Sequence, residues 1–458
     1  MRTKSGALRG LLSAFAAVVA TTMVAAAHAE SPPQRVIVKY RAAPMERDAV
    51  TMASRAMTDT GSRFGVSMRA VRQTTGGAHV VAVDRQLTRA ELANLVADLA
   101  ANADVEYAEE DKLLQATFTP NDTNYNLQWH YFEAAGGLNL PSAWDTSTGS
   151  GVRVAVIDTG YRPHADLAAN IVGGYDFISD TFVSRDGNLR DSDARDPGDW
   201  TLANDCQPGW APTESSWHGT HVSGTIAALT NNGSGVAGVA FNARVVPVRV
   251  LGRCGGFTSD IADGLVWASG GSVSGVPANA NPARVANLSL GGTGSCGTTM
   301  RNAINSARSR GTVVVVAAGN ANRNASNSTP ANCPGVITVA AVNRSGGRAF
   351  YSNFGSVVDV AAPGGAMNVN TGNGVLSTLN LGTTTPGGDA YAFYQGTSMA
   401  TPHVAGVAAL MLAVNGALTP TQVETRLRST TRAFPATCNQ CGTGIVNATA
   451  AVAAAAAP

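Results

Sequence analysis

The sequence predicts an α/β protein in which a small α+β domain precedes a large domain built on a mostly parallel central sheet. Short, β-branched apolar runs recur along the second part of the chain, at residues 152–157, 285–290 and 312–317. Such uninterrupted apolar runs are typical of parallel strands that are buried on both faces. All three lysines lie before residue 113, and this break in composition indicates a domain boundary near 113–120.

The overall composition excludes several classes of protein. Charged residues make up 14% of the 458 residues, well below the roughly 25% of an ordinary domain, so disorder driven by charge repulsion is not expected. The 32 basic and 31 acidic side chains nearly cancel. Because no excess positive field would attract phosphates or anionic lipids, we expect neither a nucleic-acid partner nor a membrane partner.

The first 29 residues have the pattern of a secretory signal peptide. Arg2, Lys4 and Arg9 precede an apolar run, and Ala27-His28-Ala29 offers small residues for cleavage. The alternative, a membrane anchor, is less favoured because the run is rich in alanine and marginal in length. We therefore expect a secreted protein that is cut after Ala29.

Residues 30–118 form the predicted small domain. Strands are expected at 35–40, at 79–84 and from Val105 onward. A helix is expected over 88–101, where Thr88 at the N-cap and Glu91 three residues later form the pattern of a capping box.

The large domain begins after this boundary and alternates strands with helices, the latter expected over 260–268 and 299–310. In a parallel sheet the functional loops gather at the carboxyl ends of the strands. The residues that carry chemistry are therefore expected at the ends of the strands.

Three segments each supply one member of a nucleophilic triad. Asp158 follows a buried strand in VIDTG, His218 opens HGTHVSG, and Ser398 lies in GTSMATPHVAG at the start of an apolar helix. Pro402 is expected in the first turn of that helix. A serine at a helix N-terminus lies near unpaired backbone N–H groups, which would stabilise an oxyanion formed there.

Each segment alone has a simpler explanation. Asp158 and Ser398 are also ordinary helix caps, and His-x-x-His is also a metal-binding pattern. Other hydrolase classes fit worse, because Ala400 replaces the second glycine of a Gly-x-Ser-x-Gly elbow and no HExxH motif is present. The combination of three motifs carries the prediction.

In this order, VIDTG, HGTHVSG and GTSMATPHVAG resemble the motifs of the subtilisin-like serine proteases over about residues 119–447. The resemblance implies a three-layer fold, with Ser398 as nucleophile, His218 as general base and Asp158 orienting the imidazole. It further implies that Asn320, in Ala-Ala-Gly-Asn, donates to the oxyanion. His221 and His403 are expected to be structural.

The same resemblance implies a binding site for protein and peptide substrates. An extended peptide would pair along Ser289, Leu290, Gly291 and Gly292. The pocket for the residue before the cut bond would be walled by Ala317, Ala318, Gly319 and Ala331. These small, uncharged walls predict a large apolar or uncharged side chain there.

The small domain then resembles the inhibitory propeptide of the family, with a ferredoxin-like α+β fold. Residues 30–118 would inhibit the catalytic domain of residues 119–447 within the same chain until self-cleavage between Leu113 and Pro120. A stable accessory domain is the alternative. Residues 448–458 are expected to be an Ala-rich tail.

Calcium is the implied cofactor, in a structural role. By resemblance, the first site draws oxygens from Asp122, Asp166, Leu229, Asn232, Ser234 and Val236. A second candidate is the acidic loop 180–205, whose seven aspartates and three arginines leave a local charge of −4 (3 − 7). Its candidate ligands are Asp186, Asp191, Asp193, Asp196 and Asp199, and a solvated charged loop is the alternative.

Export favours disulfides for the six cysteines, and fifteen pairings are possible. Three successive pairs are the simplest choice: Cys206 with Cys254, Cys296 with Cys333, and Cys438 with Cys441. The Cys438-x-x-Cys441 pair also fits half a zinc site or a redox motif. Beside a general monomeric endopeptidase, a narrow-specificity processing protease and a secreted binding protein of the same fold remain alternatives.

Overall fold

The computed structural model describes residues 33–41, 46–113 and 118–457, and the chain forms two compact units that divide between Ala116 and Thr117. The sequence analysis placed the boundary after Phe118. The predicted signal peptide lies outside the described residues, as do residues 114–117 of the expected cleavage window.

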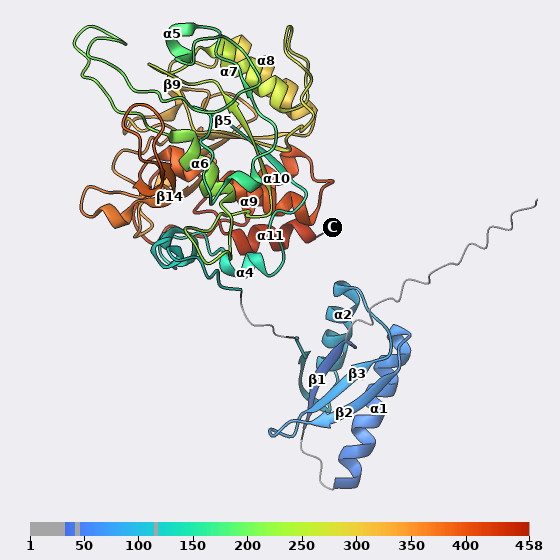
Figure 1. The fold of residues 1–458 in the computed structure, drawn as a ribbon. Helices are drawn as coiled ribbons and strands as arrows, with labels where there is room; N and C mark the ends of the chain where they lie inside the picture. The colour runs from blue at the N-terminus through green and yellow to red at the C-terminus, as the bar shows by residue number, and fades with distance from the viewer. Residues whose placement is uncertain (1–32, 42–45, 114–117, 458) are drawn as a thin grey trace, which may run out of the picture. The chain divides into compact units, whose positions relative to one another are not determined.

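The first unit is a four-stranded antiparallel sheet with two helices (Figure 1). Its strand order is β2-β3-β1-β4, with β1 Arg35–Tyr40, β2 Met68–Gln73, β3 His79–Val83 and β4 Val105–Glu110. The helices are α1 Glu46–Phe64 and α2 Arg89–Ala100. The capping box of Thr88 and Glu91 is confirmed. Strand β2 escaped prediction because nearly all its side chains are exposed, so that no apolar alternation marks it.

The second unit contains a seven-stranded sheet in the order β13-β12-β10-β8-β5-β7-β6, with every neighbouring pair parallel. The strands are β5 Arg153–Asp158, β6 Tyr175–Asp176, β7 Arg244–Arg249, β8 Val285–Leu288, β10 Val313–Ala317, β12 Ile337–Val342 and β13 Val360–Pro363. The parallel sheet expected from the β-branched runs is confirmed.

Helices cover both faces of this sheet, because its strands are apolar on both sides. Val154 and Val156 of β5 pack in a cluster with α6 His218–Ala227 and α9 Thr397–Val414. Ala155 and Ile157, which point the other way, pack with α7 Thr258–Ala268 and α8 Thr298–Ser309. The result is the three-layer α/β fold (Figure 1).

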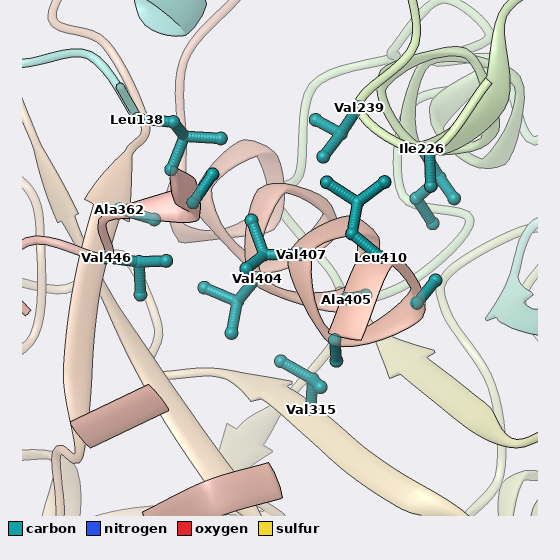
Figure 2. Packing of buried hydrophobic residues seen from close by; sticks show 14 of the residues in the cluster. Leu138, Ile226, Val239, Val315, Ala362, Val404, Ala405, Val407, Leu410 and Val446 are labelled. Carbon is teal, nitrogen blue, oxygen red and sulfur yellow. The ribbon is translucent and has the colours of Figure 1, made fainter. Parts of the chain in front are cut away.

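Helix α9 occupies the centre of the first face and is apolar all round. Val404, Val407 and Leu410 lie among side chains of the sheet and of the surrounding segments (Figure 2). Helix α9 is long and apolar enough to span a membrane, but 83% of its apolar stretch is buried inside the unit. That burial is typical of the core helix of a globular domain.

The remaining elements lie around these layers. A hairpin of β14 Val375–Asn380 and β15 Asp389–Tyr394 packs on α6 and ends just before α9. The shorter elements are β9 Gly292–Thr293, β11 Ser328–Thr329, α3 Trp129–Phe132, α4 Pro141–Trp144, α5 Thr181–Ser184 and α10 Pro420–Ser429, with 3-10 turns at Tyr125–Leu127, Ala168–Asn170, Ala325–Asn327 and Thr371–Asn373.

The Ala-rich C-terminus is a core helix and not a tail, which corrects the sequence analysis. Helix α11, Ala448–Ala456, is capped by Asn447, whose side chain accepts a hydrogen bond from the Ala450 N–H. Ala451, Val452 and Ala455 are buried in the same cluster as α9. Alanine is small enough to allow close helix packing and is the best helix former, and these properties explain the composition.

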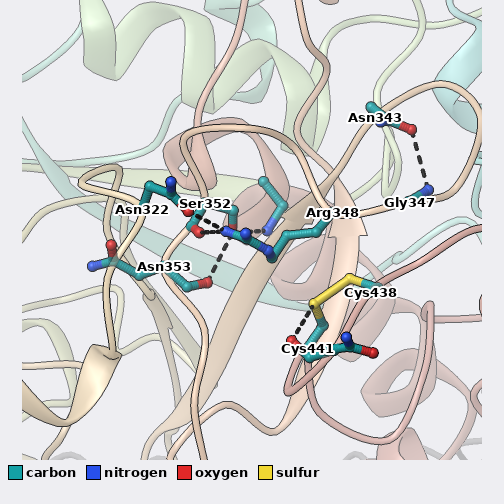
Figure 3. Close-up of a disulfide and its surroundings, with 10 residues drawn as sticks. Asn322, Asn343, Gly347, Arg348, Ser352, Asn353, Cys438 and Cys441 are labelled. Atoms are coloured by element: carbon teal, nitrogen blue, oxygen red, sulfur yellow. Dashed lines mark hydrogen bonds between the residues drawn. A yellow bond between two sulfur atoms is a disulfide. The ribbon is translucent and has the colours of Figure 1, made fainter.

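The structure contains the three disulfides Cys206–Cys254, Cys296–Cys333 and Cys438–Cys441, which confirms the successive pairing. The last bridge closes a tight loop near Arg348, whose guanidinium donates to Asn322 Oδ1 and to the Ser352 carbonyl, both at 2.6 Å (Figure 3). A bridged pair offers no thiolate to zinc, so the zinc alternative for this pair is not favoured.

We expect Ala451→Asp to lower the free energy of unfolding by about 3 kcal/mol or more, because it buries a carboxylate in the core. Ala453 is exposed on the same helix, so Ala453→Asp is the matched control and should cost less than about 1 kcal/mol. Thermal and denaturant unfolding in a Ser398→Ala background, which avoids self-digestion, would measure both. Equal losses would contradict the packing of α11.

Candidate active site

Asp158 is the last residue of β5 and is fully buried. Its Oδ1 accepts the Thr159 N–H at 2.8 Å and the Nδ1–H of His218 at 2.7 Å. Asp158 Oδ2 has no hydrogen-bond partner among the described residues. The carboxylate is therefore held on its own loop while it fixes one tautomer of the imidazole.

His218 is the first residue of α6, and a close approach of two glycines brings it to Asp158. A Cβ at Gly219 would lie 2.1 Å from the Gly160 carbonyl oxygen, so no other residue fits there without a shift. The Gly219 N–H also donates to Thr159 Oγ1 at 3.0 Å. The small residues of VIDTG and HGTHVSG thus dock the start of the helix onto the end of the strand.

Burial and charge act on His218 in opposite directions. Desolvation lowers the pKa of His218, but the charge of Asp158 and its hydrogen bond, with weaker contributions from Asp199 and Asp196, raise that pKa above the ordinary 6.5. The side chain is 21% exposed, so its outer edge remains accessible to a reacting group.

The two other histidines of the motifs are structural, as expected. His221 lies within 3.1 Å of the Val375 carbonyl and 3.0 Å of the Ala392 carbonyl, and burial lowers its pKa to about 3. His403 contacts the Met399 carbonyl and His130, and burial lowers its pKa to about 4. In the His-x-x-His pair, His218 Nδ1 bonds Asp158 and His221 Nε2 bonds the two carbonyls, so these ring nitrogens are engaged within the protein.

Ser398 lies in the first turn of α9 and exchanges hydrogen bonds with Ser289 at the end of β8. Ser398 Oγ donates to the Ser289 carbonyl at 3.1 Å, and Ser289 Oγ donates to the Ser398 carbonyl at 2.8 Å. The sequence analysis expected Pro402 in the first turn, but Pro402 is the sixth helical residue counted from Thr397. Its missing N–H would have bonded the Ser398 carbonyl, and Ser289 replaces that donor.

Asn320 follows β10 and is oriented by the start of α9. Its Oδ1 accepts the Thr397 N–H at 2.8 Å and the Thr397 hydroxyl at 2.9 Å. Among the described residues, neither Asn320 Nδ2 nor the first-turn N–H of Ser398 donates a hydrogen bond, so both can donate to a bound group.

Sequence reasoning missed Asn353, which holds the Asn320 segment in place. Buried Asn353 donates to the Ala318 carbonyl and accepts the N–H groups of Ala321 and Arg323. An asparagine between two loops carries no local signal, so only the tertiary structure reveals this role.

A cavity of about 730 Å³ opens beside Ser398 and Asn320. Most of the expected substrate-binding residues line it: Ser289, Leu290, Gly291, Gly292, Ala317, Ala318 and Gly319. Ala331 does not, since it is buried in the core on the α7 and α8 face. The cavity is also lined by Leu251, Cys254, Gly255 and Gly256, which the sequence analysis did not identify.

A second cavity adjoins the first and is lined by His218. Ser289, Leu251, Cys254 and Gly255 line both cavities. Ser398 and His218 therefore face adjoining parts of one cleft at the carboxyl ends of the strands.

The segments expected to form the first calcium site meet in space. Asp122 Oδ2 accepts the Asn231 N–H at 2.8 Å, and Asp166 accepts from Asn232 Nδ2 at 2.7 Å and from the Val236 N–H at 2.9 Å. Leu229 and Ser234 take part through their backbone N–H groups.

This arrangement fits a cation. Both carboxylates are buried, desolvation raises their pKa values, and no ion pair in the described part of the chain includes either of them. Asp122 Oδ1 is buried without a hydrogen-bond partner. A divalent cation would satisfy this oxygen and neutralise both charges.

The five candidate ligands of the expected second calcium site have partners within the protein. Asp186 pairs with Arg249, Asp193 with Arg195, Asp191 bonds Asn188, Asp196 accepts the Gly198 N–H, and Asp199 bonds Ser216. Among the described residues no three acidic, His or Cys side chains gather to hold a metal. Arg249 and Arg253 come from outside the loop and supply charge that the local count of −4 omitted.

The chain is similar to known proteases over most of its length. The model of the Subtilase family matches residues 149–444. An extracellular protease of Xanthomonas campestris is 59% identical over 392 residues, which cover 85% of this chain and 66% of that protein. An extracellular basic protease of Dichelobacter nodosus is 44% identical over 431 residues, 91% of this chain and 70% of its own length. The matched part thus spans about two thirds of these curated relatives.

A solved protease structure from Pseudoalteromonas arctica is 67% identical, with a TM-score of 0.73, over 74% of this chain and 100% of its own. At 67% identity, the two proteins are similar in amino-acid sequence as well as in fold.

Asp158→Asn should lower the pKa of His218, because the charge and hydrogen bond that oppose desolvation are lost. NMR titration of the imidazole in the Ser398→Ala background would measure this. Exposed Glu214 provides a control, since the charges that raise the His218 pKa are those of Asp158, Asp199 and Asp196, and Glu214→Gln leaves all three in place. An unchanged pKa in Asp158→Asn would contradict the electrostatic role of Asp158.

Proposed function

Because the chain belongs to the subtilase family of peptidases, we propose that it is a secreted serine endopeptidase made as a self-processing precursor. The 2.7 Å contact between His218 Nδ1 and Asp158 Oδ1 is the observation that carries the proposal. Because Nδ1 carries the proton in this contact, Nε2 is the basic nitrogen of the imidazole. His218 and Ser398 face the same cleft.

In the proposed reaction, Ser398 Oγ attacks the carbonyl carbon of the substrate and its proton passes to His218 Nε2. The negative oxygen that forms is bound by the Ser398 N–H and by Asn320 Nδ2. His218 then protonates the leaving amine, and an acyl-enzyme remains on Ser398. Water, deprotonated by His218, releases the acid and restores the serine.

This role requires neutral His218 before the attack. Because Asp158 raises the His218 pKa above 6.5, the neutral fraction falls as the pH drops through that raised value. Activity should therefore decline on the acid side, while the imidazolium formed during the reaction is stabilised by the same carboxylate.

The substrate would bind as an extended strand along Ser289 to Gly292. The side chain before the cut bond would enter the cavity of about 730 Å³, whose walls are small. Arg323 also lines this cavity, so an acidic or large uncharged residue is accommodated better than a basic one.

Residues 30–118 are proposed as the inhibitory propeptide, and residues 1–29 as the signal peptide for export. Relatives named extracellular proteases support export. The small unit has a core of its own around Val38, Leu95 and Leu99. A propeptide needs such a core, because it must fold before it is removed.

The proposal predicts self-cleavage. Residues 30–458 expressed in an oxidising compartment should lose their small unit between residues 113 and 120, as intact mass and N-terminal sequencing would show. Ser398→Ala should stay full length, because the attacking oxygen is absent. Asn320→Ala should be slower by about 10²–10³-fold, the effect of removing the oxyanion donor in subtilisin.

A folded native form that stays full length and cleaves no peptide would contradict the protease function and favour the secreted binding protein. Asn343→Ala is a control for the asparagine substitution, because Asn343 bonds only its own turn and should leave the rate unchanged.

Subtilases commonly bind structural calcium, and we assign that role to the site of Asp122 and Asp166. A bound cation would neutralise the two buried carboxylates. Chelation should therefore lower the melting temperature of the Ser398→Ala protein, and calcium should restore it.

Asp122→Asn should remove most of this calcium-dependent stabilisation, because it takes away a charged ligand. Asp145 is exposed, and Asp145→Asn is the control that should keep the full effect. Calorimetry with and without calcium measures both, and an equal calcium response in the two variants would contradict the assignment.

A further inference from the structure

The cavity on the His218 side of the cleft has an acidic residue that the proposed mechanism does not use. This cavity, of about 330 Å³, is lined by Asp199, Trp210, Ser216, His218 and Leu251, and by the Cys206–Cys254 disulfide. Asp199 and Trp210 both come from the long loop that precedes His218.

The Asp199 carboxylate is held in place but not neutralised. It accepts the Ser216 N–H at 2.6 Å and the Ser216 hydroxyl at 2.7 Å. Across the described ranges, no ion pair includes Asp199. Each carboxylate oxygen can accept more than one hydrogen bond, so both retain capacity for a further donor.

The arginines of this region are engaged elsewhere. Arg253 lies over the Phe182 ring at 4.3 Å and 3.6 Å from Asp205, and it lines a different cavity. Arg185 lies over the Trp200 ring at 3.4 Å. Apart from His218, the described residues that line the His218-side cavity include no cationic side chain.

The walls suit the stem of a long cationic side chain. Trp210 is 52% exposed at the cavity, and Leu251 provides a second apolar surface. Lysine and arginine place their methylene groups against such surfaces while the charged end reaches a carboxylate. An aromatic face adds a cation–π attraction.

The alternation of an extended peptide determines which substrate residue enters this cavity. Successive side chains of a strand point to opposite sides. If the residue before the cut bond enters the cavity beside Ser398 and Asn320, the preceding residue points to the other side of the shared wall of Leu251 and Ser289. That side is the His218-side cavity.

We propose that the His218-side cavity selects lysine or arginine at the second residue before the cut bond, with Asp199 as the specificity-determining residue. This inference rests on the proposed endopeptidase function. A cavity with this preference makes the enzyme more selective than the small-walled cavity beside Ser398 alone, because the substrate must match both the acidic group and the apolar walls.

The test compares chromogenic peptide anilides that end in Lys-Phe, norleucine-Phe or Glu-Phe and are otherwise identical. The anilide fixes the cut bond, and norleucine keeps the aliphatic stem of lysine without its charge. For the native enzyme, kcat/KM should be about tenfold higher for lysine than for norleucine, and lowest for glutamate. The lysine preference should weaken at high salt, because the cavity is open to solvent.

In Asp199→Asn the ratio of lysine to norleucine should fall to about one, whereas Glu214→Gln should keep the native ratio. Asp199 also acts on His218, but any change in the base affects all the peptides alike and cancels in the ratio. Cleavage of the norleucine peptide by Asp199→Asn shows that this variant is folded.

Equal kcat/KM values for lysine and norleucine in the native enzyme would overturn this inference and leave the protease function intact. A lysine preference that persists in Asp199→Asn would overturn the role of Asp199. A native enzyme that cleaves none of the peptides, with no self-cleavage, would overturn the proposed function and this inference with it.

Discussion

The burial of α9 against the parallel sheet is the interaction on which the rest of the large unit depends. Helix α9 is apolar all round, so burial of one face alone would leave apolar surface in water. The sheet, α6 and α11 together cover it. The same helix carries Ser398 in its first turn. A fully packed helix of the core therefore positions the candidate nucleophile, and Pro402 leaves one carbonyl there for Ser289 to bind. The packing of the core therefore fixes the position of the site residue that α9 carries.

Buried carboxylates impose the second constraint, because each needs a partner in a poorly solvated place. Asp158 has the imidazole of His218, and Asp176 has the guanidinium of Arg249. Asp122 and Asp166 are bound by N–H groups and, at Asp166, by the Tyr391 hydroxyl, but among the described residues neither has a cationic partner. This difference is why a cation is assigned to them and not to the acidic loop. Asp199 is the intermediate case, since a hydroxyl holds it while its charge remains available at the cleft.

Local patterns determined a large part of this description from the sequence. The β-branched runs of β5, β8 and β10 need burial on both faces, and that requirement implies a parallel sheet between helices. Gly160 and Gly219 approach each other so closely that no other residue type fits. These glycines are part of the motifs around Asp158 and His218, which can therefore be recognised in the sequence without a structure. The order of the three motifs supplied the family, and the even cysteine count with successive spacing supplied the disulfides.

Contacts between distant segments were decided only by the tertiary structure. Arg249 and Arg253, far along the chain, compensate the aspartates of residues 180–205, so a local charge count misjudged that loop. Ala331 lies in the core and α11 in the helix layer because burial depends on what packs opposite, which alanine does not reveal. Asn353 acts through partners 30 to 35 residues away, and Asp199 through a partner 17 residues away. Sequence pattern records the periodicity of one segment, whereas a site is made by side chains from several segments that only folding brings together.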